Sequence, residues 1–135
     1  QELTDEWKKR GVDEKIEFSG PVSYDKMPEY LGNSEILINA VPFGGLDKVV
    51  LEAMASGAVP ITSNSAFLSV FPQEFAAHLI FKPNDLDDLK NKLKNILDKK
   101  IYEDNGTRQE LRDVIIKNHN LDNLILRIIK EIKND

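Results

Sequence analysis

Hydrophobic and polar residues follow two different periods along the chain, and the periods divide it into strands and helices. Short apolar or alternating runs predict four strands, at Lys15–Ser19, Glu35–Ala40, Ala58–Thr62 and His78–Phe81. The run Glu35–Ala40 is apolar almost throughout, as expected of a strand buried on both faces. Strands that alternate with helices indicate an α/β fold, with a parallel sheet covered by helices on both faces.

Apolar residues at helical spacing predict the helices between and after these strands. The expected segments are a first helix containing Leu3 and Trp7 and ending at Gly11, then Tyr24–Leu31, Leu46–Ser56, Phe67–Phe75 broken at Pro72, a helix capped by Asn84, Asn105–Asn118 and Leu121–Lys133. The last helix carries a wide apolar stripe. We expect this stripe to pack on the domain's own sheet; the alternative is that part of it reaches a neighbouring domain.

Composition and charge narrow the class of protein. The 135 residues suffice for one domain, and 41% hydrophobic with 30% charged residues is typical of a soluble globular protein. A net charge of −5 argues against nucleic acid as a partner. The chain has no cysteine, no run of about 18 apolar residues and no signal-like start. We therefore expect a cytoplasmic protein without a transmembrane segment.

The turn Pro42–Gly45 lies between a predicted strand and the helix Leu46–Ser56, where α/β sheets bind their ligands. Two adjacent glycines allow a close approach of the backbone, and the first helical turn offers free N–H groups to an anion. This is suitable for a phosphate or diphosphate. From spacing alone, however, an ordinary tight turn is the favoured interpretation.

Three charged residues of this helix have both a structural and a functional interpretation. Asp47 is a candidate N-cap that would compete with a bound phosphate for the same N–H groups. Lys48 opposes the helix dipole, so a nearby anion would account for it. Glu52 lies among apolar neighbours and either pairs with Lys48 or accepts hydrogen bonds from two sugar hydroxyls, as carboxylates do with ribose.

The segment Leu51–Ser63, LEAMASGAVPITS, resembles the signature of family-4 retaining glycosyltransferases. These have the GT-B architecture, which consists of two Rossmann-like domains. The preceding KIEFSGPVSYDKMPEYLGNSEILINA and the following LIFKPNDLDDLKNKLKNIL are also similar to the family, so the resemblance covers approximately Val12–Ile132 in order. It implies that residues 1–135 form one Rossmann-like domain that binds a nucleotide-sugar donor.

The resemblance implies transfer of a sugar from a nucleoside diphosphate, with retention and without a metal or other cofactor. Glu52 matches the glutamate that binds the donor ribose. The loop of Gly44, Gly45, Leu46, Asp47 and Lys48 matches the segment that faces the diphosphate. The acceptor would be a glycan or a lipid-linked molecule.

The chain also departs from the family pattern. Gly44 occupies the position of the family's first glutamate, so the catalytic residue is unknown. The acceptor-binding N-terminal domain and the first strand of this domain, with its diphosphate-binding Arg and Lys, are absent from the sequence. We therefore expect a fragment that is inactive alone. The full-length protein would be a hexosyltransferase of glycan biosynthesis, cytoplasmic or peripheral at the inner face of the membrane.

Three alternatives remain at this point. A GT-B epimerase would also bind a nucleotide sugar, and a degenerate transferase would bind it without turnover. A non-catalytic α/β interaction module is the third. His78 and His119 have no partners at ligand spacing, so we expect no metal site. The tyrosines are scattered and predict no stacking platform for nucleic acid.

Overall fold

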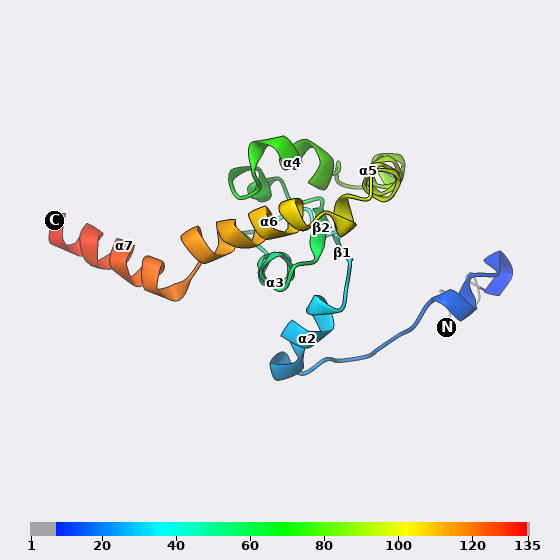
Figure 1. The fold of residues 1–135 in the computed structure, drawn as a ribbon, viewed down its shortest axis with the longest axis horizontal. Helices are drawn as coiled ribbons and strands as arrows, with labels where there is room; N and C mark the ends of the chain where they lie inside the picture. Colours follow the sequence, from blue (N-terminus) through cyan, green and yellow to red (C-terminus); the bar gives the residue numbers. More distant parts are fainter. Residues whose placement is uncertain (1–7, 135) are drawn as a thin grey trace.

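Two short parallel strands form the centre of the computed structural model, which describes residues 8–134 (Figure 1). Strand β1 is Ile36–Asn39 and β2 is Val59–Thr62, paired so that Ile36 is opposite Val59 and Asn39 is opposite Thr62. On its other side β2 makes one parallel bridge, between Thr62 and Ile80. The predicted parallel sheet is confirmed, and the carboxyl ends of its two strands lie at the same edge of the sheet.

Pro60 fits in β2 because of the direction in which the neighbouring N–H groups point. Val59 and Ser63 donate backbone hydrogen bonds to β1, to the carbonyls of Glu35 (2.9 Å) and Asn39 (3.1 Å). Pro60 falls between these donors, so the position where it lacks an N–H faces away from β1. On that side of β2, the bridge recorded is the one at Thr62. No bulge is needed to accommodate the proline.

Helices account for most of the remaining chain, and those labelled η are short 3-10 helices. In order they are residues 8–10, η1 (Asp13–Lys15), η2 (Tyr24–Lys26), α2 (Met27–Gly32), α3 (Lys48–Ser56), η3 (Ser65–Ser69), α4 (Gln73–Leu79), α5 (Leu86–Asp98), η4 (Ile101–Glu103), α6 (Asn105–Asn118) and α7 (Leu121–Asn134). Helices α3 and α4 both contact β2 and lie on opposite sides of it (Figure 1). The fold is therefore α/β, with helices on both faces of the sheet, as the sequence predicts.

The hydrophobic core lies where β2 meets α3, η3 and α4. Its fully buried side chains come from all of these elements and from α5 and α6; the largest are Phe67, Met54, Ile61, Leu79, Ile96 and Leu111. Helix α3 also packs against α6 and α2. Helix α3 is therefore enclosed by β2, α2 and α6.

Several boundaries differ from the sequence prediction. The strand expected at Lys15–Ser19 is wrong: η1 ends at Lys15 and the following residues are exposed and irregular. Figure 1 shows this segment running as a connection away from the sheet, where no described strand lies beside it. The first predicted helix falls mostly outside the described residues, although Gly11 has the positive φ of 63° expected after a helix end.

The strand expected at His78–Phe81 is also mostly wrong, because α4 continues to Leu79 and only Ile80 bridges to β2. The nearby helix α5 is capped by Asp85, whose side chain accepts a hydrogen bond from the Asp88 N–H at 2.9 Å, and not by Asn84. Asn84 instead adopts a left-handed conformation, with φ of 60°. Asparagine tolerates this conformation better than most residues.

Helix α7 does not pack on the sheet, so the expected packing of its stripe is wrong. It contacts α6 and projects away from the body of the molecule (Figure 1). The described apolar residues of the stripe are exposed, namely Leu121, Leu124, Ile125, Ile129 and Ile132. β1 shows a related departure, because Ile38 is 47% exposed although the apolar run predicts burial on both faces.

Helix α6 begins at a well-formed cap, which gives a prediction for the effect of pH. The Asp104 carboxylate accepts hydrogen bonds from the hydroxyl (2.6 Å) and the N–H (2.7 Å) of Thr107. These bonds hold the pKa of Asp104 below its ordinary value of 3.8. Because the pKa of Asp104 is lower in the folded chain than in the unfolded one, the cap stabilises the fold fully at pH values above the ordinary pKa. This stabilisation is lost as the pH falls through the lowered pKa.

We therefore expect the free energy of unfolding to fall in acid, and part of that fall to disappear in Asp104→Asn, which keeps a capping oxygen but does not titrate. Urea denaturation at several values between about pH 6 and pH 2 measures this. An equally steep acid loss in Asp104→Asn and the parent chain would contradict the assignment.

Candidate functional site

The loop between β1 and α3 is held in place by a small network of buried polar side chains at the strand ends. Asn39 at the end of β1 accepts hydrogen bonds through Oδ1 from the Val41 N–H (3.2 Å) and from the Thr62 hydroxyl (3.3 Å). The Thr62 Oγ1 in turn accepts a hydrogen bond from the backbone N–H of Asn64 (3.1 Å). The network joins the carboxyl ends of the two strands beneath the loop.

Asn64 extends this network to the glycine loop itself. Its Nδ2 donates to the Gly45 carbonyl at 2.9 Å and to Asp47 Oδ2 at 3.4 Å, while its Oδ1 accepts from the Ala66 N–H at 3.0 Å. Only 2% of Asn64 is exposed. This side chain fixes the loop from below and leaves the other surface of Gly44 and Gly45 exposed.

Asp47 occupies the N-cap position of α3, but its side chain makes no capping hydrogen bond. It points instead to Asn64, so the predicted competition between Asp47 and a phosphate for the helix N–H groups does not occur in this conformation. In the first turn of α3, the N–H groups of Val50 and Leu51 donate to the Asp47 carbonyl, so the N–H groups that precede them at the start of the helix are the ones suited to an anion. Lys48, the first residue of the helix, is exposed beside them.

Gly44 adopts φ of 122°, and nothing lies within 4 Å of the position where a Cβ would stand. The space is open, but this backbone conformation strains any residue with a side chain. The difference between Gly44 and the glutamate that the resemblance implies at this position therefore involves the backbone as well as the carboxylate.

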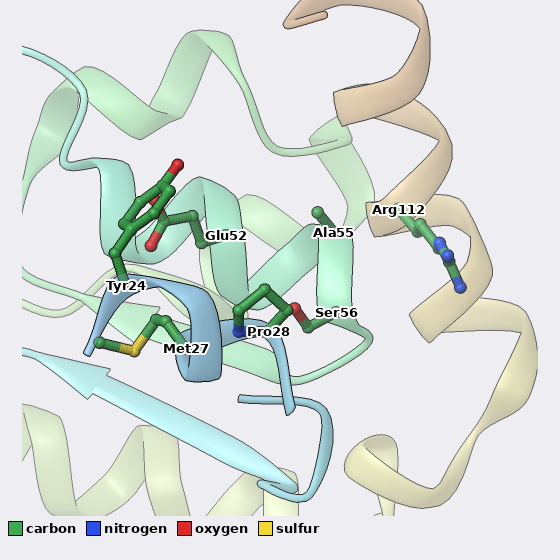
Figure 2. Close-up of a pocket in the computed structure, with 7 residues that line it drawn as sticks. All are labelled: Tyr24, Met27, Pro28, Glu52, Ala55, Ser56 and Arg112. Atoms are coloured by element: carbon green, nitrogen blue, oxygen red, sulfur yellow. The ribbon is translucent and has the colours of Figure 1, made fainter. Parts of the chain in front are cut away.

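Glu52 is half-buried and lines a pocket of about 450 Å³ on the outer side of α3. Among the described residues no ion pair between Glu52 and Lys48 is recorded, so of the two interpretations of Glu52 the pairing with Lys48 is not formed in this structure. Figure 2 shows the Tyr24 ring beside the Glu52 carboxylate, with Met27 and Pro28 of α2 below. The pocket residues are Tyr24, Met27, Pro28, Glu52, Ala55, Ser56 and Arg112.

The site residues predicted from the sequence thus form two adjoining groups. Gly44, Gly45, Leu46, Asp47 and Lys48 form the loop and the start of α3, and Glu52 faces the pocket. Lys48 and Glu52 are four residues apart on α3, which places them about 6 Å apart along the helix axis. A ribose at Glu52 and a phosphate group at the helix start are compatible with this spacing.

Three residues of the site were not identified from the sequence. Tyr24 is 82% exposed and presents its ring to the pocket, although the tyrosines predicted no stacking platform. Asn64 is the buried support of the loop. Arg112 of α6 lines the far rim of the pocket, but its guanidinium points away from Glu52 (Figure 2). The polar residues that follow β2 in the sequence could have indicated a role for Asn64. The position of Tyr24 at the pocket could not be predicted, because it depends on the path of the chain before α2.

A known protein family matches most of this sequence. The model of the family described as glycosyl transferases group 1 matches residues 1–128. The chain belongs to this family. The glycosyltransferase resemblance of Leu51–Ser63 is therefore confirmed, and the chemistry that group 1 membership supports is sugar transfer. No curated protein matches the chain.

The described residues contain neither a cluster of metal-ligating side chains nor a membrane-spanning helix. Within residues 8–134, no group of three or more His, Asp or Glu side chains could hold a metal ion. No helix in the same part of the chain combines the length and the apolar character needed to cross a membrane. His78 hydrogen-bonds through Nδ1 with Asn95 Nδ2 at 3.1 Å, which agrees with a structural role for this histidine.

Proposed function

We propose that this domain binds the nucleoside diphosphate sugar donor of a retaining, family-4 glycosyltransferase of GT-B architecture. The observation that carries the proposal is the position of Glu52, whose carboxylate faces a pocket about one helical turn from the uncapped start of α3. A carboxylate suits the two hydroxyls of a ribose, and helix N–H groups suit phosphate. The loop Gly44–Lys48 would contact the diphosphate, with Lys48 adding a positive charge.

Tyr24 completes the donor site in this proposal. A base attached to a ribose at Glu52 would lie against the pocket wall formed by Tyr24, Met27 and Pro28. An exposed aromatic ring gains stabilisation when a flat base covers it. These three residues carry no charge, so this wall alone does not distinguish uracil, guanine and adenine.

In the transfer, the bond between the sugar C1 and the β-phosphate oxygen breaks, and a bond from C1 to an acceptor hydroxyl oxygen forms. The acceptor proton passes to the leaving diphosphate. Negative charge develops on that diphosphate, and preorganised N–H groups at the start of α3 would stabilise it. With Gly44 at the position of the family's glutamate, we assign donor binding to this chain and no catalytic side chain.

The remaining parts of the proposal come from the family resemblance. A second domain would present the acceptor, which is a glycan or a lipid-linked molecule, and the transferred unit would be a hexose. Neither a metal nor another cofactor takes part in this proposal. The reaction would take place in the cytoplasm, with the acceptor reaching the site from solution or from the inner face of the membrane.

Calorimetric titration with UDP, GDP and ADP tests the role of Glu52. We expect Glu52→Gln to weaken binding of the preferred nucleotide about ten- to a hundredfold, equivalent to about 1.4–2.8 kcal/mol. The matched control is Glu29→Gln, the same change on the exposed surface of α2, which should leave the affinity unchanged. Equal affinities for the parent chain and Glu52→Gln would refute the ribose assignment.

The 2′-deoxy forms of the same nucleotides make this test more specific. If Glu52 accepts a hydrogen bond from the 2′-hydroxyl, the parent chain loses affinity for the deoxy nucleotide, whereas Glu52→Gln has little left to lose. Tyr24→Ala should weaken both forms equally, since the base is the same in both. A deoxy penalty of the same size in Glu52→Gln would show that Glu52 acts elsewhere.

A further inference from the structure

In the described structure, strand β1 has a neighbouring strand on one side only. On that side the carbonyls of Glu35 and Asn39 accept hydrogen bonds from backbone N–H groups of β2 and of the residue that follows it. The backbone groups of alternate residues in a strand point to the same side, so the N–H and carbonyl groups of Ile36 and Ile38 face the open edge. An open edge of this kind is a template on which another strand can pair.

The side chains of β1 indicate what kind of strand would fit this edge. Ile38 is 47% exposed, whereas a strand within an α/β sheet is normally covered on both faces. Glu35, directly before β1, is exposed, and no ion pair between it and another described residue is recorded. A strand that completes this edge should therefore bring an apolar side chain to Ile38 and a positive charge to Glu35.

The N-terminal arm, which comprises residues 8–19, contains a segment that meets both requirements. Lys15 is exposed and supplies the positive charge. Ile16 and Phe18 follow it at alternate positions and are 37% and 67% exposed. Segments with this alternation form strands only when a neighbouring strand is present. The segment Lys15–Ser19 is long enough to pair with all four residues of β1.

The charges select one direction for this pairing. If the segment runs parallel to β1 with Phe18 opposite Ile38, then Lys15 lies opposite Glu35. Opposite charges then meet at one end of the pair and apolar side chains at the other, and both contacts stabilise neighbouring strands. Antiparallel pairing of the same apolar positions moves Lys15 to the Asn39 end of β1, away from Glu35. The parallel direction is also the one in which β1 and β2 pair.

The arm is directed away from β1 of its own chain. Its last residue, Ser19, shares a hydrogen bond of 2.6 Å between its Oγ and the Tyr30 hydroxyl of α2. From there the arm runs away from the sheet (Figure 1). Pairing with β1 of the same chain would break this bond and turn the arm back, whereas β1 of a second copy can receive the arm as it stands. Exchange of an identical segment between two copies is a low-cost route to a dimer.

We propose that two copies of this chain exchange their N-terminal arms, so that Lys15–Ser19 of each copy adds a parallel strand to the open edge of β1 in the other. Each β1 then has a strand on both sides, Phe18 of one copy covers Ile38 of the other, and Lys15 meets Glu35. The dimer does not depend on donor binding, because no residue that lines the Glu52 pocket belongs to the arm or to β1.

Sedimentation equilibrium measures the association and its dependence on charge. We expect a dimer whose Kd rises at least about tenfold in Lys15→Glu and in Glu35→Lys, because each change places like charges opposite each other at both exchanged strands. A chain that carries both changes should recover most of the affinity. Lys9→Glu, the same change on the arm outside the pairing segment, is the control and should leave the Kd unchanged. A chain that stays monomeric at about 1 mM, or a double variant no tighter than the single ones, would overturn the inference.

Cysteine substitutions distinguish exchange between copies from closure within one chain, because the chain has no cysteine of its own. Phe18→Cys and Ile38→Cys chains are mixed, refolded together and oxidised. We expect a disulfide-linked pair with one chain of each kind, since neighbouring strands lie about 4.7–4.9 Å apart, within the reach of a disulfide. Leu68→Cys replaces Phe18→Cys in the control mixture, which should give only background linkage. A disulfide formed within a single chain that carries both cysteines, with none between the mixed chains, would contradict the exchange of arms.

Discussion

Phe67→Ala is expected to lower the free energy of unfolding by about 3–5 kcal/mol, more than any other substitution proposed for this chain. Phe67 is fully buried in the core, and its ring centroid lies 5.4 Å from that of Phe71. Alanine leaves a cavity between β2 and the helices that surround it, and this part of the core is too enclosed to collapse around the gap. Because whole domains are stable by only about 5–15 kcal/mol, much of the chain should unfold at 37 °C.

Urea denaturation followed by circular dichroism measures this loss. Leu68→Ala is the matched control, since the adjacent side chain in the same 3-10 helix is 62% exposed and its truncation should cost less than about 1 kcal/mol. Similar losses for Phe67→Ala and Leu68→Ala would contradict the placement of Phe67 at the centre of the core.

Asn64→Ala has the second largest expected effect, and it acts on both stability and function. The substitution removes the hydrogen bonds to the Gly45 carbonyl and to Asp47, and it removes the cap on the Ala66 N–H. The loss of these bonds from a buried position should cost about 2–4 kcal/mol. The glycine loop would lose its support, so amide hydrogen exchange at Gly44, Gly45 and Asp47 should become faster.

Ser65→Ala is the control for Asn64→Ala, because Ser65 is exposed and adjacent in sequence. It should leave both the unfolding free energy and the exchange of the loop amides unchanged. Nucleotide affinity should fall in Asn64→Ala and remain in Ser65→Ala. An Asn64→Ala chain with unchanged loop exchange would show that the loop is held by contacts other than the Asn64 amide.

The sequence predicts a helix best where the apolar periodicity and the residues that begin or end the helix indicate the same bounds. The α3 segment has an apolar stripe that ends at Gly57, and the structure ends α3 there with φ of 91° at that glycine. The Gly57 carbonyl also accepts a hydrogen bond from Arg108 Nε at 2.6 Å, which helps to hold α6 against α3. For α6 the predicted and observed bounds agree, at Asn105 and Asn118, and the structure adds the N-cap at Asp104.

The predictions fail where the structure of a segment depends on contacts with another part of the chain, which the local sequence pattern does not reveal. Lys15–Ser19 alternates like a strand, but in the described structure no strand lies beside it, and alternation alone does not form a sheet. His78–Phe81 is apolar enough for a strand, yet α4 extends through Leu79 and Lys92 bonds to the Ala77 carbonyl beside it. The stripe of α7 predicts burial but does not indicate the surface that buries it.

For the candidate site, the sequence identifies the residues on α3 but not those that reach α3 from elsewhere. Glu52 and the loop Gly44–Lys48 are close together in the sequence, so their placement on α3 and just before it follows from the spacing of apolar residues. Tyr24 and Asn64 come from other segments, and only the fold brings the first to Glu52 and the second beneath Gly45. The uncapped state of α3 depends on the rotamer of Asp47, which sequence does not determine.

Amide NMR titration of this chain with a nucleoside diphosphate tests the central claim most directly, because it shows both whether the donor binds and where. With UDP, GDP or ADP, we expect the largest shifts at the backbone of Gly45–Lys48, together with shifts around Glu52 and Tyr24. The nucleoside alone should shift the second group and leave the first unchanged. Shifts confined to other surfaces, or no saturable shift with any of the three nucleotides, would contradict the donor-binding assignment.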